Sequence, residues 1–340
     1  MRDLVLVTEG SGYIAGFCIA CLLREGWRVR ASVKSVVESN RARAHLDKIG
    51  VEAAAVEFVE ADVNCDHGWD RAVADADYVF HASVPNSKVD PNGVGEPVQT
   101  RRDAALRVLK AARDAGVKRA VVTSSISAII YGRRARESPF SETDWTDETN
   151  RADSSPRCRG ATIVEREIWA WHGAEGGALE LVTVNPGLVI GPVPGPDFLS
   201  SVGLIKDLLD GKTPALFHFG YSLVDVRDIA QLHVLAMTTP AAAGQRFIGA
   251  GDFFWIKDIA RILRNGLGEK ARSVPSLDFP DFLVRVLAVF NPVARSRLCD
   301  LGNERKVSSE KAWRTLGWKA RPASESILDA ARSLHTMGLV

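Results

Sequence analysis

The sequence has few cysteines, and charge of neither sign is in excess. Its 5 cysteines are scattered, and only Cys18 and Cys21 lie close together along the chain. An odd set of this kind predicts neither a disulfide framework nor a metal site, and it fits a reducing, cytoplasmic compartment. The 43 basic and 42 acidic residues leave a net charge of +1. No polyanionic partner is therefore indicated, and we expect no nucleic acid binding.

Long hydrophobic runs are also missing. The most apolar late stretch, residues 279–290, contains Asp281 and Arg285 and is too short to span a bilayer. Its pattern predicts a buried helix. The first strand is expected within three residues of Met1, which leaves no room for a signal peptide. We therefore expect no membrane association.

Residues 4–25 form the most informative stretch that is present. An aliphatic run from Leu4 to Val7 predicts a buried strand, glycines follow, and an apolar period predicts a helix over 14–25 that ends at Gly26. Strand, glycine loop and helix in this order are typical of the first unit of a dinucleotide-binding domain, where backbone amides at the helix start bind a pyrophosphate. The candidate cofactor-binding residues are Gly10, Gly12, Tyr13 and Ile14.

Strands and helices alternate after this unit. The predicted strands are 27–33, 55–60, 78–82, 119–125 and 179–185, and the predicted helices between them are 40–49, 100–115 and 161–175. This alternation predicts an α/β fold with a Rossmann-type, doubly wound parallel sheet. We expect a dinucleotide-binding-like domain over 1–185, to which 220–250 returns, and a small, mainly helical substrate-binding cap over 186–340. The polar segment 138–159 predicts a long surface loop.

The glycine motif is incomplete. A G-x-x-G-x-x-G rhythm falls on Glu9, Gly12 and Ala15. Alanine is tolerated at the third position, whereas Glu9 adds a side chain to a tight turn and a negative charge beside a phosphate. An alternative is that Glu9 faces solvent and Gly10 takes over the turn. Lys34, at the end of the second strand, favours NADP because a basic residue there accommodates a 2′-phosphate; a solvated lysine at a strand end is the alternative.

These features resemble the extended short-chain dehydrogenase/reductase family, and within it the dihydroflavonol-reductase and aldehyde-reductase branch. The segments that carry the resemblance are 7–8, 10–14, 30–34, 62–63, 79–82, 122–125, 184–187, 191–192, 224–228 and 316–318. They extend over nearly the whole chain. The resemblance implies the same fold, an NADP(H) site that includes Asp62 and Val63, and a small-molecule substrate.

The family's catalytic residues are a serine, a tyrosine that donates a proton and a lysine four residues after the tyrosine. The resemblance assigns the serine to Ser125. Alignment through 162–166 and Trp169 puts Arg157 at the tyrosine position and Ala161 at the lysine position. A guanidinium cannot donate a proton at neutral pH, and a general acid typically contributes 10²–10⁴-fold to the rate.

The substitutions at residues 9, 157 and 161 all affect one ligand and one reaction. They predict an enzyme that has lost NADP-dependent hydride transfer and performs lyase, isomerase or cyclase chemistry on a small aromatic or oxygen-rich metabolite. Such an enzyme needs no cofactor, and if it binds a dinucleotide, we expect NADP(H). Ser125 and Arg157 would bind an oxyanion, and Glu9 or His81 would move the proton.

Two other functions remain open. One is an NADPH-dependent carbonyl reductase with an atypical proton donor, and the other is a non-catalytic ligand-binding protein of the same fold. The candidate residues also have structural explanations: Arg157 as a surface arginine at a helix start, Ser125 as a strand-end hydroxyl bound to local backbone, and His81 as a packed histidine. We expect a monomer or a homodimer.

Overall fold

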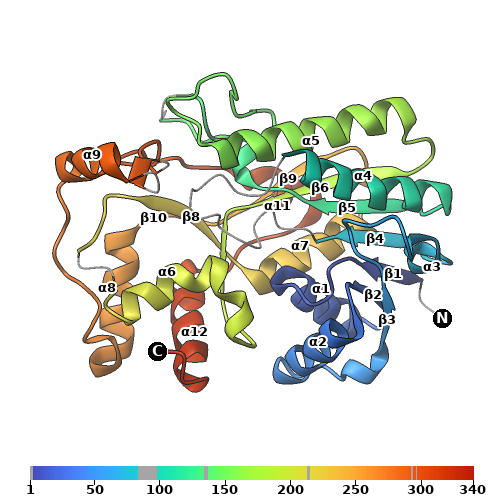
Figure 1. The fold of residues 1–340 in the computed structure, drawn as a ribbon, viewed down its shortest axis with the longest axis horizontal. Coiled ribbons are helices and arrows are strands. Elements are labelled where there is room, and N and C mark those ends of the chain that lie inside the picture. The colour runs from blue at the N-terminus through green and yellow to red at the C-terminus, as the bar shows by residue number, and fades with distance from the viewer. Residues whose placement is uncertain (1–2, 83–97, 134–136, 213–214, 292–293, 296) are drawn as a thin grey trace.

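The computed structural model describes residues 3–82, 98–133, 137–212, 215–291, 294–295 and 297–340, without the side chains of 198–201 (Figure 1). Its main sheet has seven strands in the order β3-β2-β1-β4-β5-β6-β9, and every neighbouring pair is parallel. The strands are β1 (Leu4–Val7), β2 (Arg28–Val33), β3 (Val56–Glu60), β4 (Tyr78–His81), β5 (Arg119–Thr123), β6 (Glu180–Pro186) and β9 (Arg246–Gly249). The predicted fold class is confirmed.

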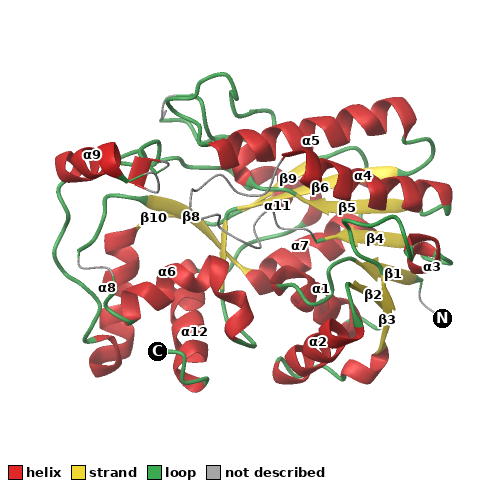
Figure 2. Cartoon of the chain, viewed as in Figure 1, coloured by secondary structure: helices red, strands yellow, loops and turns green. Residues whose placement is uncertain are grey.

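Helices cover both faces of this sheet, as Figure 2 shows. One face carries α1 (Tyr13–Arg24), α2 (Val36–Lys48) and α7 (Val226–Thr238), and the other carries α3 (Trp69–Val73), α4 (Val98–Asp114) and α5 (Pro156–Glu175). Aliphatic side chains of the strands pack against both helix layers and form two separate hydrophobic clusters. Burial on both faces explains why central strands such as β1 are apolar at every position.

The start of α5 corrects the predicted loop. The helix begins at Pro156 instead of Ala161, because Ser155 caps it by accepting a hydrogen bond from the backbone N–H of Cys158 at 3.4 Å. The preceding segment is not a surface loop throughout, since Phe140 and Thr146 are buried. The arginines of the first helical turn hid the apolar period on which the prediction depended.

The second half of the chain contains a small sheet that the sequence did not predict. Its strands are β7 (Leu188–Ile190), β8 (Gly220–Asp225) and β10 (Phe253–Trp255), with β8 in the centre, parallel to β7 and antiparallel to β10. The helices of this half are α6 (Leu199–Leu209), α8 (Ile256–Leu267), α9 (Asp281–Phe290), α11 (Glu310–Leu316) and α12 (Ala323–Thr336). Short 3₁₀ helices are η1 (Ala53–Ala55), η2 (Ile126–Ala128), η3 (Pro196–Phe198), η4 (Pro240–Ala242) and η5 (Gly268–Ala271).

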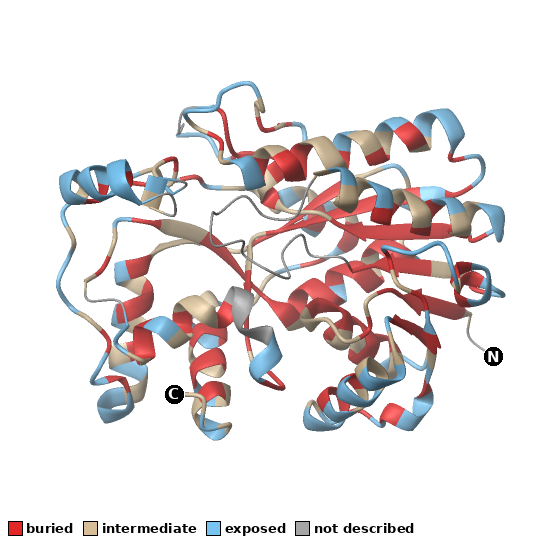
Figure 3. Cartoon of the chain, viewed as in Figure 1, coloured by how far each residue is buried: buried red, intermediate tan, exposed pale blue. Residues whose placement is uncertain are grey.

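The predicted burial of residues 279–290 is wrong. In α9 only Val284 and Ala288 are buried, while Phe282 is 64% and Phe290 is 83% exposed (Figure 3). The helix lies at the edge of the molecule, where only one side has a neighbour. Among the described residues, no helix is both long and apolar enough to cross a membrane.

Candidate functional site

The loop between β1 and α1 keeps a tight turn although its first glycine is replaced. Glu9 has a φ of 51°, in the left-handed region that favours glycine. The N–H of Gly12 closes the turn by donating to the carbonyl oxygen of Glu9 at 2.7 Å. The alternative in which Gly10 takes over the turn is therefore wrong. A non-glycine residue in this conformation costs about 1–2 kcal/mol.

Gly10 has a different, steric role. A Cβ atom at this position would lie 2.7 Å from the Cβ of Ala31 on β2, and the N–H of Gly10 donates to the carbonyl oxygen of Ser32 at 2.8 Å. The loop thus lies directly on β2. Since Gly12, the N-cap of α1, has no side chain, the first amides of the helix are accessible to an anion. The shape of this loop fits a dinucleotide pyrophosphate.

The charge of Glu9 does not fit a phosphate as well. Glu9 is half-buried, and its N–H donates to the hydroxyl of Ser32 at 3.3 Å, so the residue is held beside the start of α1. A carboxylate there interacts favourably with the helix dipole and unfavourably with a phosphate. The loop therefore combines a binding shape with a charge that lowers affinity.

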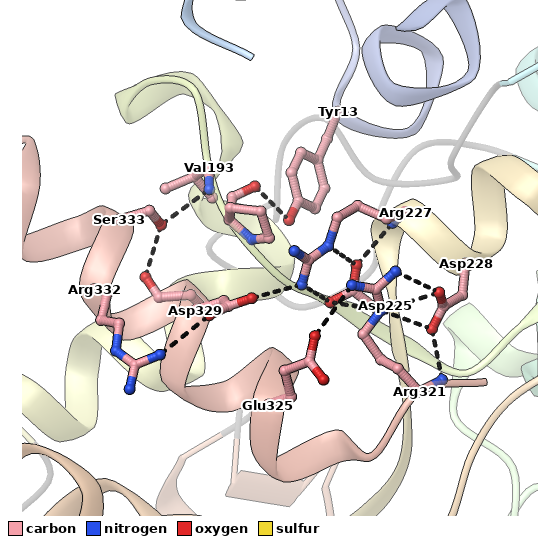
Figure 4. A network of polar contacts seen from close by, with 12 residues as sticks. Tyr13, Val193, Asp225, Arg227, Asp228, Arg321, Glu325, Asp329, Arg332 and Ser333 are labelled. Atoms are coloured by element: carbon pink, nitrogen blue, oxygen red, sulfur yellow. Dashed lines mark hydrogen bonds and ion pairs between the residues drawn. The ribbon is translucent and has the colours of Figure 1, made fainter. Parts of the chain in front are cut away.

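Tyr13 and Ile14 begin α1, and their backbone faces the same loop. The Tyr13 hydroxyl donates to the carbonyl oxygen of Pro192 at 3.1 Å (Figure 4), and burial raises the pKa of this phenol well above its ordinary value. The side chain thus ties α1 to the segment after β7.

Lys34 follows β2 and is exposed. Its N–H donates to the Glu38 carboxylate at 3.1 Å, and the Ser11 hydroxyl donates to the same oxygen at 3.5 Å. Glu38 was missed by the sequence analysis, because it lies in α2 and not at the strand end. This place therefore offers a cation for a 2′-phosphate and a carboxylate for a ribose hydroxyl.

Asp62 and Val63 lie after the carboxyl end of β3. The Asp62 carboxylate accepts from the N–H of Asn64 at 2.9 Å, and the Val63 carbonyl accepts from Arg107 at 2.6 Å. Parallel strands end at one edge, so these residues share that edge with the glycine loop. The structure places all seven candidate cofactor residues on this edge or directly beside it.

His81 is held inside the protein at the end of β4. It is 2% exposed, and its Nδ1 is hydrogen-bonded to the Thr8 hydroxyl at 3.1 Å. Burial lowers the pKa of His81 to about 4, so the imidazole is neutral at pH 7 and is a weak base. This arrangement agrees with the packed-histidine alternative.

Ser125 follows β5 at the ligand edge. Its hydroxyl accepts from the N–H of Ser127 at 3.1 Å, and its carbonyl accepts from the side-chain amide of Asn185 at 3.2 Å. The bond to local backbone agrees with the structural alternative. It uses a lone pair of the hydroxyl, so the proton can still be donated to a substrate oxygen.

Glu165 is a second residue that the sequence analysis did not identify as important. It is 1% exposed, and its carboxylate accepts from Ser124 at 2.6 Å, from Asn185 and Arg246 at 2.7 Å each, and from Thr183 at 3.0 Å. It joins α5 to β6, to β9 and to Ser124, the residue that follows β5. Asn185 contacts both Glu165 and the carbonyl of Ser125. A charged residue in the buried stripe of a helix was the available signal.

Arg157 is exposed in the first turn of α5. Asp153, four residues before it, forms an ion pair with Arg305. Arg157 lies near Asp300 and Tyr221, close enough that its charge lowers the pKa of both groups against the larger, opposite effect of burial. It therefore faces a group of polar residues, and it is also a surface residue.

Two tyrosines belong to this group. The Tyr131 hydroxyl donates to Asp300 Oδ1 at 2.8 Å, and the Tyr221 hydroxyl accepts from Nη1 of Arg297 at 2.8 Å. The fold thus gathers two phenols in one group of polar residues with Asp300 and Arg297, and the charge of Arg157 acts on this group. The sequence alone could not show this, because Arg297 and Tyr221 are 76 positions apart.

Comparison with known proteins extends the resemblance. A model of the NAD dependent epimerase/dehydratase family matches residues 5–249. Tetraketide alpha-pyrone reductase 2 of Arabidopsis thaliana is 32% identical over 265 residues, which cover 76% of this chain and 81% of the relative. Cinnamoyl-CoA reductase 1 of Petunia hybrida is 28% identical over 338 residues, covering 99% and 93%. The structure of yeast methylglyoxal/isovaleraldehyde reductase complexed with NADPH has a TM-score of 0.80 at 20% identity, covering 99% and 100%, and shows the same fold.

These relatives correct the functional prediction. The expected loss of hydride transfer in favour of lyase, isomerase or cyclase chemistry is wrong, because the relatives are reductases. The error was to take a missing tyrosine and lysine at residues 157 and 161 as a missing reaction. The reductase alternative is the one that the relatives favour. The chain belongs to the NAD dependent epimerase/dehydratase family of the extended short-chain dehydrogenases/reductases, and it is an enzyme of this oxidoreductase lineage.

Proposed function

We propose that the protein is an NADPH-dependent carbonyl reductase that converts a small aldehyde or ketone into an alcohol. The observation that carries the proposal is the β1–α1 loop, which keeps its tight turn and its contact with β2 despite Glu9. A loop with no ligand to bind has no evident reason to keep a strained residue at Glu9. The reductase names of the relatives support the same reaction class.

The residues that would hold the cofactor are those at the carboxyl edge. The amides that follow Gly10 and Gly12 would bind the pyrophosphate, Lys34 the 2′-phosphate, and Asp62 and Val63 the adenosine end. When bound, the reduced nicotinamide would supply the hydride for the carbonyl carbon. Ser125 would donate a hydrogen bond to the carbonyl oxygen, which polarises the carbonyl group.

Ala161 bears on the affinity for NADPH, and Arg157 bears on the choice of substrate. Ala161 cannot make the ribose contact that the family's lysine provides, so we propose that NADPH binds more weakly here than in an enzyme with that lysine. Arg157 offers a bidentate donor for a carboxylate or another oxygen on the substrate. We therefore propose a substrate that carries an anionic or oxygen-rich group beside its carbonyl.

Two measurements test the proposed function. NADPH fluorescence should increase on titration with the protein, and NADPH absorbance should decrease when cinnamaldehyde, isovaleraldehyde or methylglyoxal is added. The variant Lys34→Ala should weaken NADPH binding more than NADH binding, because only NADPH has the 2′-phosphate. An unchanged fluorescence at saturating protein would rule out a dinucleotide site.

A further inference from the structure

Tyr131 and Tyr221 use their hydroxyl groups in opposite ways. Tyr131 is 8% exposed and gives its proton to the hydrogen bond with Asp300. Tyr221 accepts its hydrogen bond from Arg297, so that bond does not occupy its proton. A phenol in the second arrangement can donate to another oxygen, and the neighbouring guanidinium stabilises the phenolate that results.

Tyr221 is also connected to the neighbourhood of Ser125. Asn185, which donates to the carbonyl of Ser125, is followed two residues later by Gly187. Gly187 lies so close to β8 that a Cβ there would be 2.3 Å from the carbonyl oxygen of Ser222. Ser222 is the next residue after Tyr221. These backbone contacts place β8, the strand that carries Tyr221, beside the segment that follows β6, which is the same segment that contacts Ser125 through Asn185.

The strand that carries Tyr221 is firmly held. Tyr221 pairs with Phe254 of β10. At the other end of β8, Asp225 accepts from the N–H and the guanidinium of Arg227 at 2.8 Å, and Arg227 also pairs with Asp329 of α12 at 2.7 Å (Figure 4). A group that transfers a proton must be fixed within hydrogen-bond reach of its partner. The strand pairing and these ion pairs fix the backbone of β8, which is the part of this requirement that the chain itself provides.

We propose that Tyr221 is the proton donor of this reductase and that Arg297 is a positioning residue that takes the place of the family's lysine. The inference rests on the proposed function. The O–H bond of Tyr221 breaks, and its proton forms the new O–H bond on the substrate's carbonyl oxygen. The carbonyl carbon is reduced by a hydride from the reduced nicotinamide dinucleotide, which is oxidised. Solvent then returns a proton to the phenolate.

The decisive variant is Tyr221→Phe, with Tyr78→Phe as the matched control. Tyr78 begins β4 at the opposite edge of the sheet and packs against Trp27. Loss of a general acid should lower kcat by about 10²–10⁴-fold, while the Kd for NADPH, measured by fluorescence, stays unchanged. Tyr78→Phe should retain the wild-type kcat. Far-ultraviolet circular dichroism establishes that each variant is folded.

The pH profile separates a proton donor from a structural tyrosine. The groups facing the Tyr221 phenol are Arg297 and Arg157, which lower its pKa, and Asp300 and Cys299, which raise it; burial is the largest effect and raises it overall. The phenol therefore stays protonated through neutral pH, and wild-type kcat/KM should be flat from about pH 6 to 9. In Tyr221→Phe, solvent must supply the proton, so kcat/KM should fall as pH rises.

Arg297 is tested by two substitutions. Arg297→Met should lower kcat more than tenfold at an unchanged Kd for NADPH, and Arg297→Lys, which restores a cation, should recover most of the loss. A Tyr221→Phe enzyme with the wild-type rate and pH profile would overturn the inference and leave the proposed function intact. The inference would also be overturned if Tyr131→Phe lost activity while Tyr221→Phe kept it. If the wild-type protein binds NADPH and reduces none of the three carbonyl compounds, the proposed function fails and this inference fails with it.

Discussion

Replacing Glu9 by glycine should improve both stability and cofactor binding, for two separable reasons. Glu9 has a φ of 51°, and glycine removes the cost of about 1–2 kcal/mol that a side chain adds in this conformation. Part of this gain is lost to the greater freedom of glycine in the unfolded chain. A net gain of about 1 kcal/mol corresponds to a rise in Tm of about 2 °C for a chain of this size.

The effect on binding comes from charge. Two unit charges about 6 Å apart at an effective dielectric constant of about 20 interact by about 3 kcal/mol. Glu9 is only half-buried, so screening by solvent and salt reduces this repulsion to about 1–2 kcal/mol. Glu9→Gly should therefore lower the Kd for NADPH roughly 5- to 30-fold. The improvement should shrink as salt is raised from about 0.05 M to 0.5 M.

The variant Glu9→Gln separates the two effects, because it removes the charge and keeps a side chain at the positive φ. We expect it to reproduce the gain in NADPH affinity without the gain in Tm. The assays are fluorescence titration of NADPH and thermal unfolding followed by circular dichroism. If Glu9→Gly and Glu9→Gln both bind NADPH as weakly as the wild type, Glu9 does not repel the phosphates, and the electrostatic reasoning is refuted.

Three other predictions concern stability, each measured by urea unfolding. Gly10→Ala should destabilise the protein by about 1–3 kcal/mol and weaken NADPH binding, because its Cβ would lie 2.7 Å from that of Ala31; wild-type values would show that the loop can move away from β2. Burial lowers the pKa values of His81 and His233 to about 4, so the unfolded chain takes up protons first and stability should fall from about pH 6.5 towards pH 4, by about 3 kcal/mol per histidine. A free energy of unfolding that does not change over this pH range would contradict the prediction for the two histidines. Glu165→Gln should cost about 3–5 kcal/mol, because Arg246 would lose its buried partner, and a loss below 1 kcal/mol would refute that role.

The main sheet was predictable because its strands contain short runs of β-branched and aliphatic residues bounded by turn residues. Leu4–Val7 and Arg119–Thr123 are buried at every position, and this pattern is visible without tertiary information. The position of the ligand edge follows from the same strands, since parallel strands all end there. Gly10, Ser125 and Lys34 could therefore be placed at or beside the site from the sequence.

The small sheet and the polar group around Arg157 could not be predicted. β7 and β10 have three residues each, too few to show a period, and their pairing depends on residues far along the chain. The exposure of α9 could not be predicted either, because the sequence of an apolar helix does not show whether one side or all sides have neighbours. The contact between Tyr221 and Arg297 requires the fold itself.

A proton donor on β8 would also explain how the substitutions at residues 157 and 161 could accumulate without ending the proposed chemistry. In the family, tyrosine and lysine lie one helical turn apart on one element, so replacing either disrupts both. Here the proposed donor, Tyr221, lies on β8, which is joined to α7 and α12 by the ion pairs of Arg227 with Asp225 and Asp329 (Figure 4). A donor on this sheet does not depend on what occupies α5. Residue 157 is then available for the substrate contact proposed above.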